Sequence, residues 1–192
     1  MWKTNEADLA SRQVMRAVAR HDARSPTEAW IAGLGDESDR ALEAIAEIIT
    51  VVEVFTTETM IEVSEQLAKD AQPPVRRVAL AAGRKEAEGS WVSRRDFAKN
   101  WTGKSWGDKA WFREWLGYVE ARNAWAHGHG TLTRMQQGRT DVLDLLKSAD
   151  VGVSGTRVLL SALDVRRCGD SALRLVGELD EMLRQHRLPR PS

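Results

Sequence analysis

One long stretch of helical periodicity constrains this sequence more than any other feature. From Ser38 onward, apolar side chains recur at steps of three and four residues until the Pro73-Pro74 pair ends the pattern. The members of this series are Leu42, Ile45, Ile49, Val52, Met60, Val63 and Leu67. Segment 50–59 is rich in β-branched residues, but the helical spacing continues on both sides of it. The sequence therefore predicts one helix over 38–71, about 45 to 50 Å long, which leaves length for a partner to pack along it near Val52.

Shorter helical patterns flank this element. They predict helices over 6–21, 75–88, 93–101, 108–126 and 132–146. Asp108 is expected to cap the helix over 108–126. A capping box at Ser25-Pro26-Thr27-Glu28 predicts a further short helix that ends near Gly33 or Gly35.

The C-terminal part has a different pattern. Residues 151–161 predict a small β-hairpin with a Ser-Gly turn, and Asp170 is expected to cap a C-terminal helix. The predicted fold class is therefore mainly α, a helical bundle with one small hairpin. We expect an N-terminal helical extension over 1–37 and a single helical core over 38–192.

Composition limits the functional classes. No apolar run approaches the roughly 20 residues that cross a bilayer, and the polar N-terminus lacks a secretory pattern, so we expect a cytoplasmic protein without a membrane partner. Cys168 is the only cysteine, which excludes an internal disulfide and a thiolate zinc site. The formal net charge is +0, which argues against a protein that coats nucleic acid through bulk charge. No cofactor is expected.

Segment 91–139 is locally basic and rich in tryptophan. It holds six tryptophans, namely Trp91, Trp101, Trp106, Trp111, Trp115 and Trp125. Such a mixture can stack bases and hold phosphates, although packing in a core is the more common role of any single tryptophan. The pattern alone leaves both interpretations open.

Two polar side chains interrupt the apolar face of the helix predicted over 108–126. On a helical wheel, one half holds Trp111, Phe112, Trp115, Leu116, Tyr118, Val119, Trp125 and Ala126. Arg122 and Asn123 fall inside that half. A guanidinium in such a place requires a charged partner, a ligand or a subunit interface, because an unpaired buried charge costs several kcal/mol, on the order of 3 to 5.

His127 follows this pair. If the helix ends at Ala126, Gly128 and Gly130 free the chain to bring His127 beside Arg122. An imidazole and a guanidinium together suit the cleavage of a phosphodiester, with proton exchange at the ribose 2′-hydroxyl or the leaving 5′-oxygen and charge stabilisation at phosphate. No metal is needed, and the internal nucleophile requires RNA. The alternative is structural, since Arg and His are also favoured in the last turn of any helix.

The segment Glu-Ala-Arg-Asn-Ala-Trp-Ala-His-Gly resembles the HEPN (higher eukaryotes and prokaryotes nucleotide-binding) superfamily, whose ribonucleases carry an R-x4-6-H motif with a polar residue after the Arg. Here the motif matches Arg122, Asn123 and His127. The resemblance implies an all-α, HEPN-like bundle over about 38–187 that forms a homodimer with the two motifs facing each other. It also implies metal-independent RNA cleavage to a 2′,3′-cyclic phosphate. In this scheme Arg122 stabilises the scissile phosphate, His127 transfers protons and Asn123 orients one or both.

Members of that superfamily include toxins held by an antitoxin, antiviral-defence components and modules that bind without cutting. We therefore expect RNA as the substrate, a second copy of the chain as a partner, and an antitoxin or defence-system protein as a further partner. The alternatives are a non-catalytic module for RNA, nucleotide or protein, and a purely structural helical partner.

Two nearby residues are weaker candidates for substrate binding. His129 lies two residues beyond His127 and is expected in the following loop. Tyr118 lies one turn before Arg122, where its hydroxyl is placed to hold the guanidinium or to pack in the core. Glu120 and the two histidines match no established metal-ligand spacing, so no metal site is expected.

Overall fold

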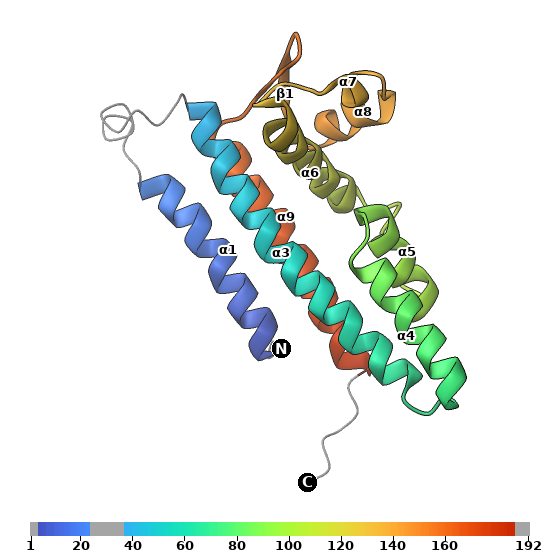
Figure 1. Ribbon diagram of the computed structural model, residues 1–192. Helices are drawn as coiled ribbons and strands as arrows, with labels where there is room; N and C mark the ends of the chain where they lie inside the picture. The colour runs from blue at the N-terminus through green and yellow to red at the C-terminus, as the bar shows by residue number, and fades with distance from the viewer. Residues whose placement is uncertain (1–3, 24–36, 187–192) are drawn as a thin grey trace.

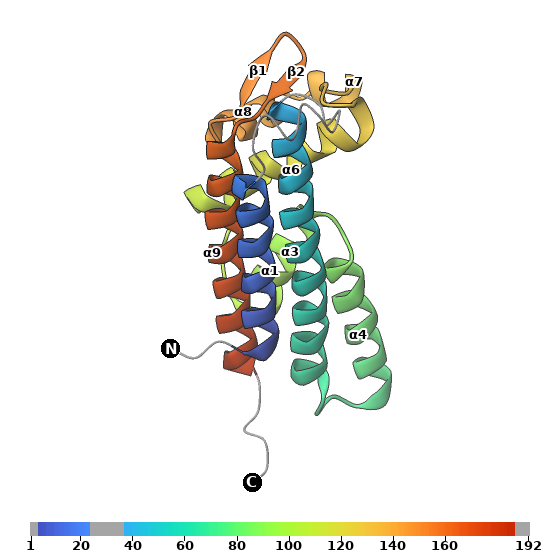
Figure 2. The same ribbon diagram turned by 90° about the vertical axis from the view of Figure 1, so that its left-hand side faces the viewer.

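The computed structural model describes residues 4–23 and 37–186. Three long helices lie side by side and form the body of the molecule: α1 (Asn5–Ala23), α3 (Glu37–Ala68) and α9 (Ala162–His186) (Figures 1 and 2). α1 runs antiparallel to α3, whereas α3 and α9 run in the same direction (Figure 1). The mainly α class predicted from the sequence is confirmed, as is the small hairpin. The capping box at 25–28 lies outside the described residues.

α3 is the central element. It has neighbours on several sides, since α1, α4, α6 and α9 all pack against it. Ile45, Ile48, Ile49 and Val52 are fully buried in the common core. The β-branched segment stays helical because its apolar side chains are buried against neighbouring helices, while buried threonine hydroxyls find acceptors within the helix, as Thr56 does at the carbonyl of Val52 at 2.6 Å. The long helix predicted over 38–71 is therefore present, three residues shorter at its C-terminal end.

α1 packs into the same core through small side chains. Ala7, Ala10, Val14 and Ala17 are buried against α3 and α9. Its first turn is anchored at Asp180 in α9, whose Oδ1 accepts a hydrogen bond from the backbone N–H of Thr4 at 3.0 Å.

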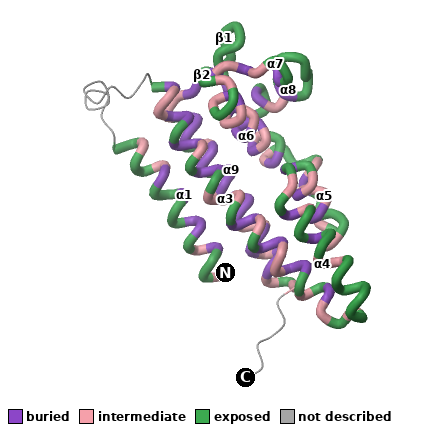
Figure 3. Tube along the Cα trace, in the orientation of Figure 1, coloured by how far each residue is buried: buried purple, intermediate pink, exposed green. Residues whose placement is uncertain are grey.

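A second group of helices packs on one side of this layer (Figure 1). α4 (Pro73–Ala87), α5 (Trp91–Thr102) and α6 (Ala110–Gly128) follow α3 in sequence. Figure 3 shows that α4 is largely exposed, with only Gly83 and Ala87 buried. An aromatic cluster fills the space around α5 and α6, where Trp91, Trp106 and Trp115 are buried. The core interpretation of these tryptophans is confirmed, since the other three of the central segment also pack against the core.

The predicted helix over 132–146 is wrong in one respect, because the structure divides it. α7 (Arg134–Gln137) begins at a capping box between Thr133 and Gln136 and ends at Gly138, and α8 (Thr140–Ser148) follows. The division falls at Gly138, the C-cap of α7, and at Arg139, whose extended backbone precedes the first turn of α8.

The hairpin consists of β1 (Gly152–Ser154) and β2 (Arg157–Leu159), paired antiparallel with Ser154 opposite Arg157. Its turn residues are therefore Gly155 and Thr156 rather than Ser-Gly, and Gly155 takes the positive φ of 61°. α9 begins earlier than predicted. Asp164 accepts hydrogen bonds from the N–H and hydroxyl of Ser161, so the start lies at Ala162 and Asp170 is inside the helix.

Candidate functional site

α6 carries the Arg-Asn-x-x-x-His segment to its last turn. Its N-cap is Lys109, not Asp108, and its final residue is Gly128. His129 adopts a left-handed conformation with φ 50° and closes the helix by donating its N–H to the carbonyl of Trp125. The expectation that the helix ends at Ala126 and lets His127 swing toward Arg122 is therefore wrong. Five helical positions place these two side chains about 140° apart around α6.

The partner that Arg122 requires is a carboxylate from another helix. Its Nη2 donates to Oε2 of Glu53 in α3 at 2.9 Å, and its Nη1 donates to Oδ1 of Asn123 at 3.4 Å. The Arg122 side chain remains 27% exposed. The guanidinium is thus held by the protein but still reachable from solvent.

Glu53 serves a second guanidinium as well. Nη1 of Arg94, in α5, lies 3.8 Å from Oε1 of Glu53. Burial lowers the pKa of Arg94, the Glu53 carboxylate opposes that shift, and the nearby charge of Arg122 adds to it. The three side chains together carry one net positive charge. Because the Arg94 side chain is only 8% exposed, that excess charge is accessible at Arg122.

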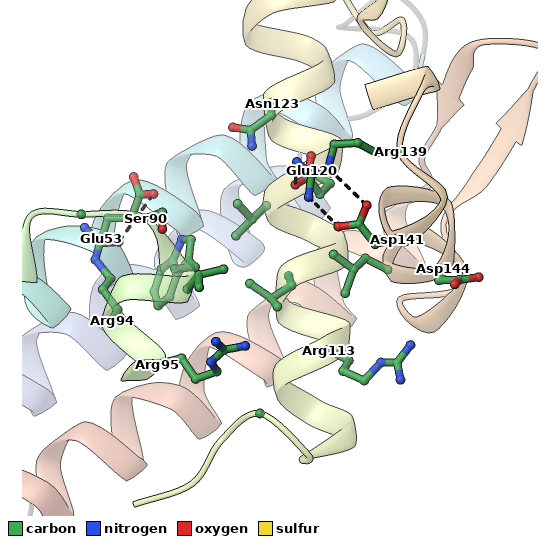
Figure 4. A pocket seen from close by; sticks show the side chains of 17 residues that line it. Glu53, Ser90, Arg94, Arg95, Arg113, Glu120, Asn123, Arg139, Asp141 and Asp144 are labelled. Carbon is green, nitrogen blue, oxygen red and sulfur yellow. Dashed lines mark hydrogen bonds and ion pairs between the residues drawn. The ribbon is translucent and has the colours of Figure 1, made fainter. Parts of the chain in front are cut away.

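A cavity of about 700 Å³ opens beside this group, bounded by residues of α3, α5, α6 and α8 (Figure 4). Its apolar lining includes Trp91, Leu116, Val119 and Leu145. Charged and polar side chains surround this lining: Glu53, Ser90, Arg94, Arg95, Arg113, Glu120, Asn123, Arg139, Asp141 and Asp144. An apolar surface with a polar rim is typical of ligand sites.

One close ion pair lies on the α8 side of the cavity, between Arg139 and Asp141. Arg139 donates to Asp141 through Nε at 3.2 Å and Nη2 at 2.5 Å, and this hydrogen bonding raises the pKa of Arg139 and lowers that of Asp141. Glu120 accepts from Nε2 of Gln136 at 2.8 Å. Arg139 and Asp141 therefore neutralise each other, with Glu120 4.0 Å from Arg139, whereas no ion pair within the described residues engages Asp144 or Arg113.

One face of α6 connects the cavity with His127. Leu116, Glu120 and Asn123 line the cavity, and they follow one another at steps of four and three residues. His127 is the next member of this series, one turn beyond Asn123. It is exposed, as is His129. The structure therefore brings Arg122 and Asn123 into contact and aligns Asn123 with His127, but it does not place Arg122 and His127 on one side of the helix.

Tyr118 lies in the core. Its side chain is fully buried, and its hydroxyl donates to the carbonyl of Ala149 at 3.3 Å. Burial raises the pKa of Tyr118 well above its usual range, and Cys168 and Asp164 act in the same direction. The hydroxyl is therefore occupied at Ala149, so of the two alternatives for Tyr118 the structure shows packing in the core and not contact with Arg122.

Glu53 and Arg94 are the two site residues that the sequence did not single out. Glu53 is one of many acidic residues along α3, and Arg94 is followed directly by Arg95, so local pattern distinguishes neither. Within the described residues, no three His, Cys, Asp or Glu side chains gather where a metal ion would be held. None of the described helices combines the length and apolar character required to cross a bilayer.

Comparison of the chain with protein-family models, with curated proteins and with solved structures finds no match.

Proposed function

We propose that this protein is a metal-independent endoribonuclease of HEPN type, acting in the cytoplasm as a toxin or antiviral-defence component. The resemblance of the Arg122–His127 segment to that superfamily suggests the class. The observation that carries the proposal is the Arg122 group, in which two guanidiniums share one carboxylate and leave an accessible positive charge next to Asn123. Such a charge is suited to a phosphodiester.

The proposed reaction needs only side chains and the RNA itself. His127 takes the proton of the ribose 2′-hydroxyl as its oxygen attacks phosphorus, and the bond from phosphorus to the 5′-oxygen breaks. The leaving 5′-oxygen takes a proton from water, His127 returns its proton to the solvent, and the products are a 2′,3′-cyclic phosphate and a 5′-hydroxyl. Arg122 stabilises the charge that develops on the phosphate oxygens, and Asn123 orients the phosphate between them.

The helical geometry favours a site shared by two copies. Because Arg122 and His127 of one α6 point about 140° apart, Arg122 of one protomer meets His127 of its partner more readily across a two-fold axis. Val54, which follows Glu53 in α3, is 53% exposed and offers apolar contact area to a second copy. The cavity then receives nucleotides that flank the cleaved bond.

The first test is cleavage of total RNA by the purified protein in EDTA. Wild type is expected to produce 2′,3′-cyclic phosphate ends, and Arg122→Ala and His127→Ala are each expected to lose at least about a hundredfold in rate. The matched controls are Arg77→Ala, an exposed arginine in α4, and His186→Ala at the end of α9, far from the α6 C-terminus (Figure 1). Undiminished cleavage by both site variants refutes the proposal.

Mixing the two inactive variants tests the shared site. A heterodimer of Arg122→Ala and His127→Ala contains one intact composite site, so an equilibrated mixture should recover about a quarter of wild-type activity. No recovery, with heterodimers demonstrated by mass spectrometry, contradicts a site formed across the two-fold axis.

The cavity supports a second candidate function, a non-catalytic module that binds RNA, a nucleotide or a protein. Its volume of about 700 Å³ and its apolar lining suit the binding of a ligand. This alternative is favoured if the wild-type protein binds RNA but yields no cleaved product, also when divalent ions are present.

A further inference from the structure

We propose that Glu53 and Arg94 are positioning residues for the reaction at Arg122. Arg94 holds the carboxylate of Glu53, and Glu53 holds the guanidinium of Arg122 in the orientation that meets the phosphate. The inference rests on the proposed function.

Arg94 is the fixed end of this chain of contacts. Its Nε donates to the carbonyl of Ala87 at 3.0 Å, and its Nη2 donates to Oγ1 of Thr57 at 3.2 Å. Its guanidinium also lies 4.7 Å from the centre of the Trp91 ring. Contacts from α3, from the end of α4 and from α5 itself therefore determine one orientation.

Glu53 is held in place by this buried cation. One carboxylate oxygen faces Arg94 at 3.8 Å and the other accepts from Arg122 at 2.9 Å. An RNA phosphate that displaced the carboxylate would leave Arg94 as an uncompensated buried charge, which is unfavourable. Glu53 therefore stays, and the phosphate meets the exposed side of an Arg122 whose long side chain is already ordered.

This arrangement predicts a specific kinetic effect. Glu53→Gln keeps the shape of the side chain but removes the ionic contact with Arg122, so kcat should fall by about tenfold because the guanidinium is oriented less precisely at the phosphate. KM should not rise, because removal of a negative charge beside the phosphate site does not weaken the binding of an anion. Glu53→Asp, which keeps the charge with a shorter reach, should retain an intermediate kcat.

A double-variant comparison separates positioning from general damage. If Glu53 acts only through Arg122, the variant carrying both Glu53→Gln and Arg122→Ala should cleave no more slowly than Arg122→Ala alone. Glu58→Gln, at an exposed glutamate in the same helix, is the matched control and should behave like wild type. Thermal unfolding of each variant is measured alongside.

The outcomes distinguish this inference from the proposed function. Wild-type protein that cuts no RNA refutes the proposed function. Wild-type protein that cuts, with Glu53→Gln folded and equal to it or faster, overturns the positioning role alone. The positioning role is also overturned if Glu53→Gln lowers the cleavage rate by the same factor whether Arg122 is present or replaced by alanine.

Discussion

The close approach of α6 and α8 at Gly117 predicts how much an alanine there changes the free energy of unfolding. α6 passes so close to α8 at this glycine that an added Cβ would lie 2.3 Å from the carbonyl oxygen of Leu145 and 2.6 Å from the Cβ of Ala149. The first obstacle is backbone of α8 and the second is the Cβ of its C-cap residue, and neither can turn aside as the end of a long side chain can, so Gly117→Ala forces the two segments apart. Gly177 in α9 is the matched control, because a Cβ there meets nothing within 4 Å.

Two opposing effects determine the size of the change. Overpacking costs about 1 to 3 kcal/mol, and a backbone obstacle places Gly117→Ala near the upper end of that range. The better helix propensity of alanine returns up to about 1 kcal/mol, which is the whole effect at Gly177. We therefore expect Gly117→Ala to lower the free energy of unfolding by about 2 kcal/mol, and Gly177→Ala to raise it by up to about 1 kcal/mol.

Thermal unfolding followed by circular dichroism measures both changes. For a chain of this length, 1 kcal/mol corresponds to a Tm change of about 2 to 4 °C, so Gly117→Ala should lower Tm by about 4 to 8 °C. Gly177→Ala should raise it by no more than about 4 °C. A Gly117→Ala variant as stable as wild type refutes the close approach of α6 and α8.

Three further predictions concern single side chains. Tyr118 is the only tyrosine, and burial raises its pKa, so the native state keeps the proton that the unfolded state loses near about pH 10. The free energy of unfolding should therefore fall as the pH rises above about 10. The ultraviolet absorbance of tyrosinate should appear only as the protein unfolds. Ser38→Ala removes a buried hydroxyl that accepts from the Leu160 N–H at 3.0 Å, which should cost about 1 to 3 kcal/mol in urea unfolding and speed hydrogen exchange at that amide. His129→Gly relieves a left-handed backbone conformation with φ 50° and should raise the free energy of unfolding by about 0.5 to 1 kcal/mol; a loss of stability contradicts the assigned conformation.

The elements that were predictable from the sequence are those whose pattern repeats many times. The central helix repeats its apolar spacing over nine turns, so even the β-branched stretch between Thr50 and Thr59 did not obscure it. Boundaries depend instead on one or two hydrogen bonds. The start of α9 is set by the contacts between Ser161 and Asp164, and Asp170 offers the same residue type six positions later without those contacts. Residue types that can cap a helix are visible in the sequence. Which of two such positions begins the helix depends on the packing of the whole helix.

The candidate site shows the same division between local and tertiary information. The position of Arg122 on an apolar face required a partner, and that requirement was correct. The sequence did not show which residue is that partner, because Glu53 lies 69 residues before Arg122 and α3 carries acidic residues along most of its length. Arg94 was harder still, since only folding makes it buried while the adjacent Arg95 stays more exposed. A charge on the wrong face of a helix thus predicts that a network exists, whereas the members of the network follow only from the way in which α3, α5 and α6 meet.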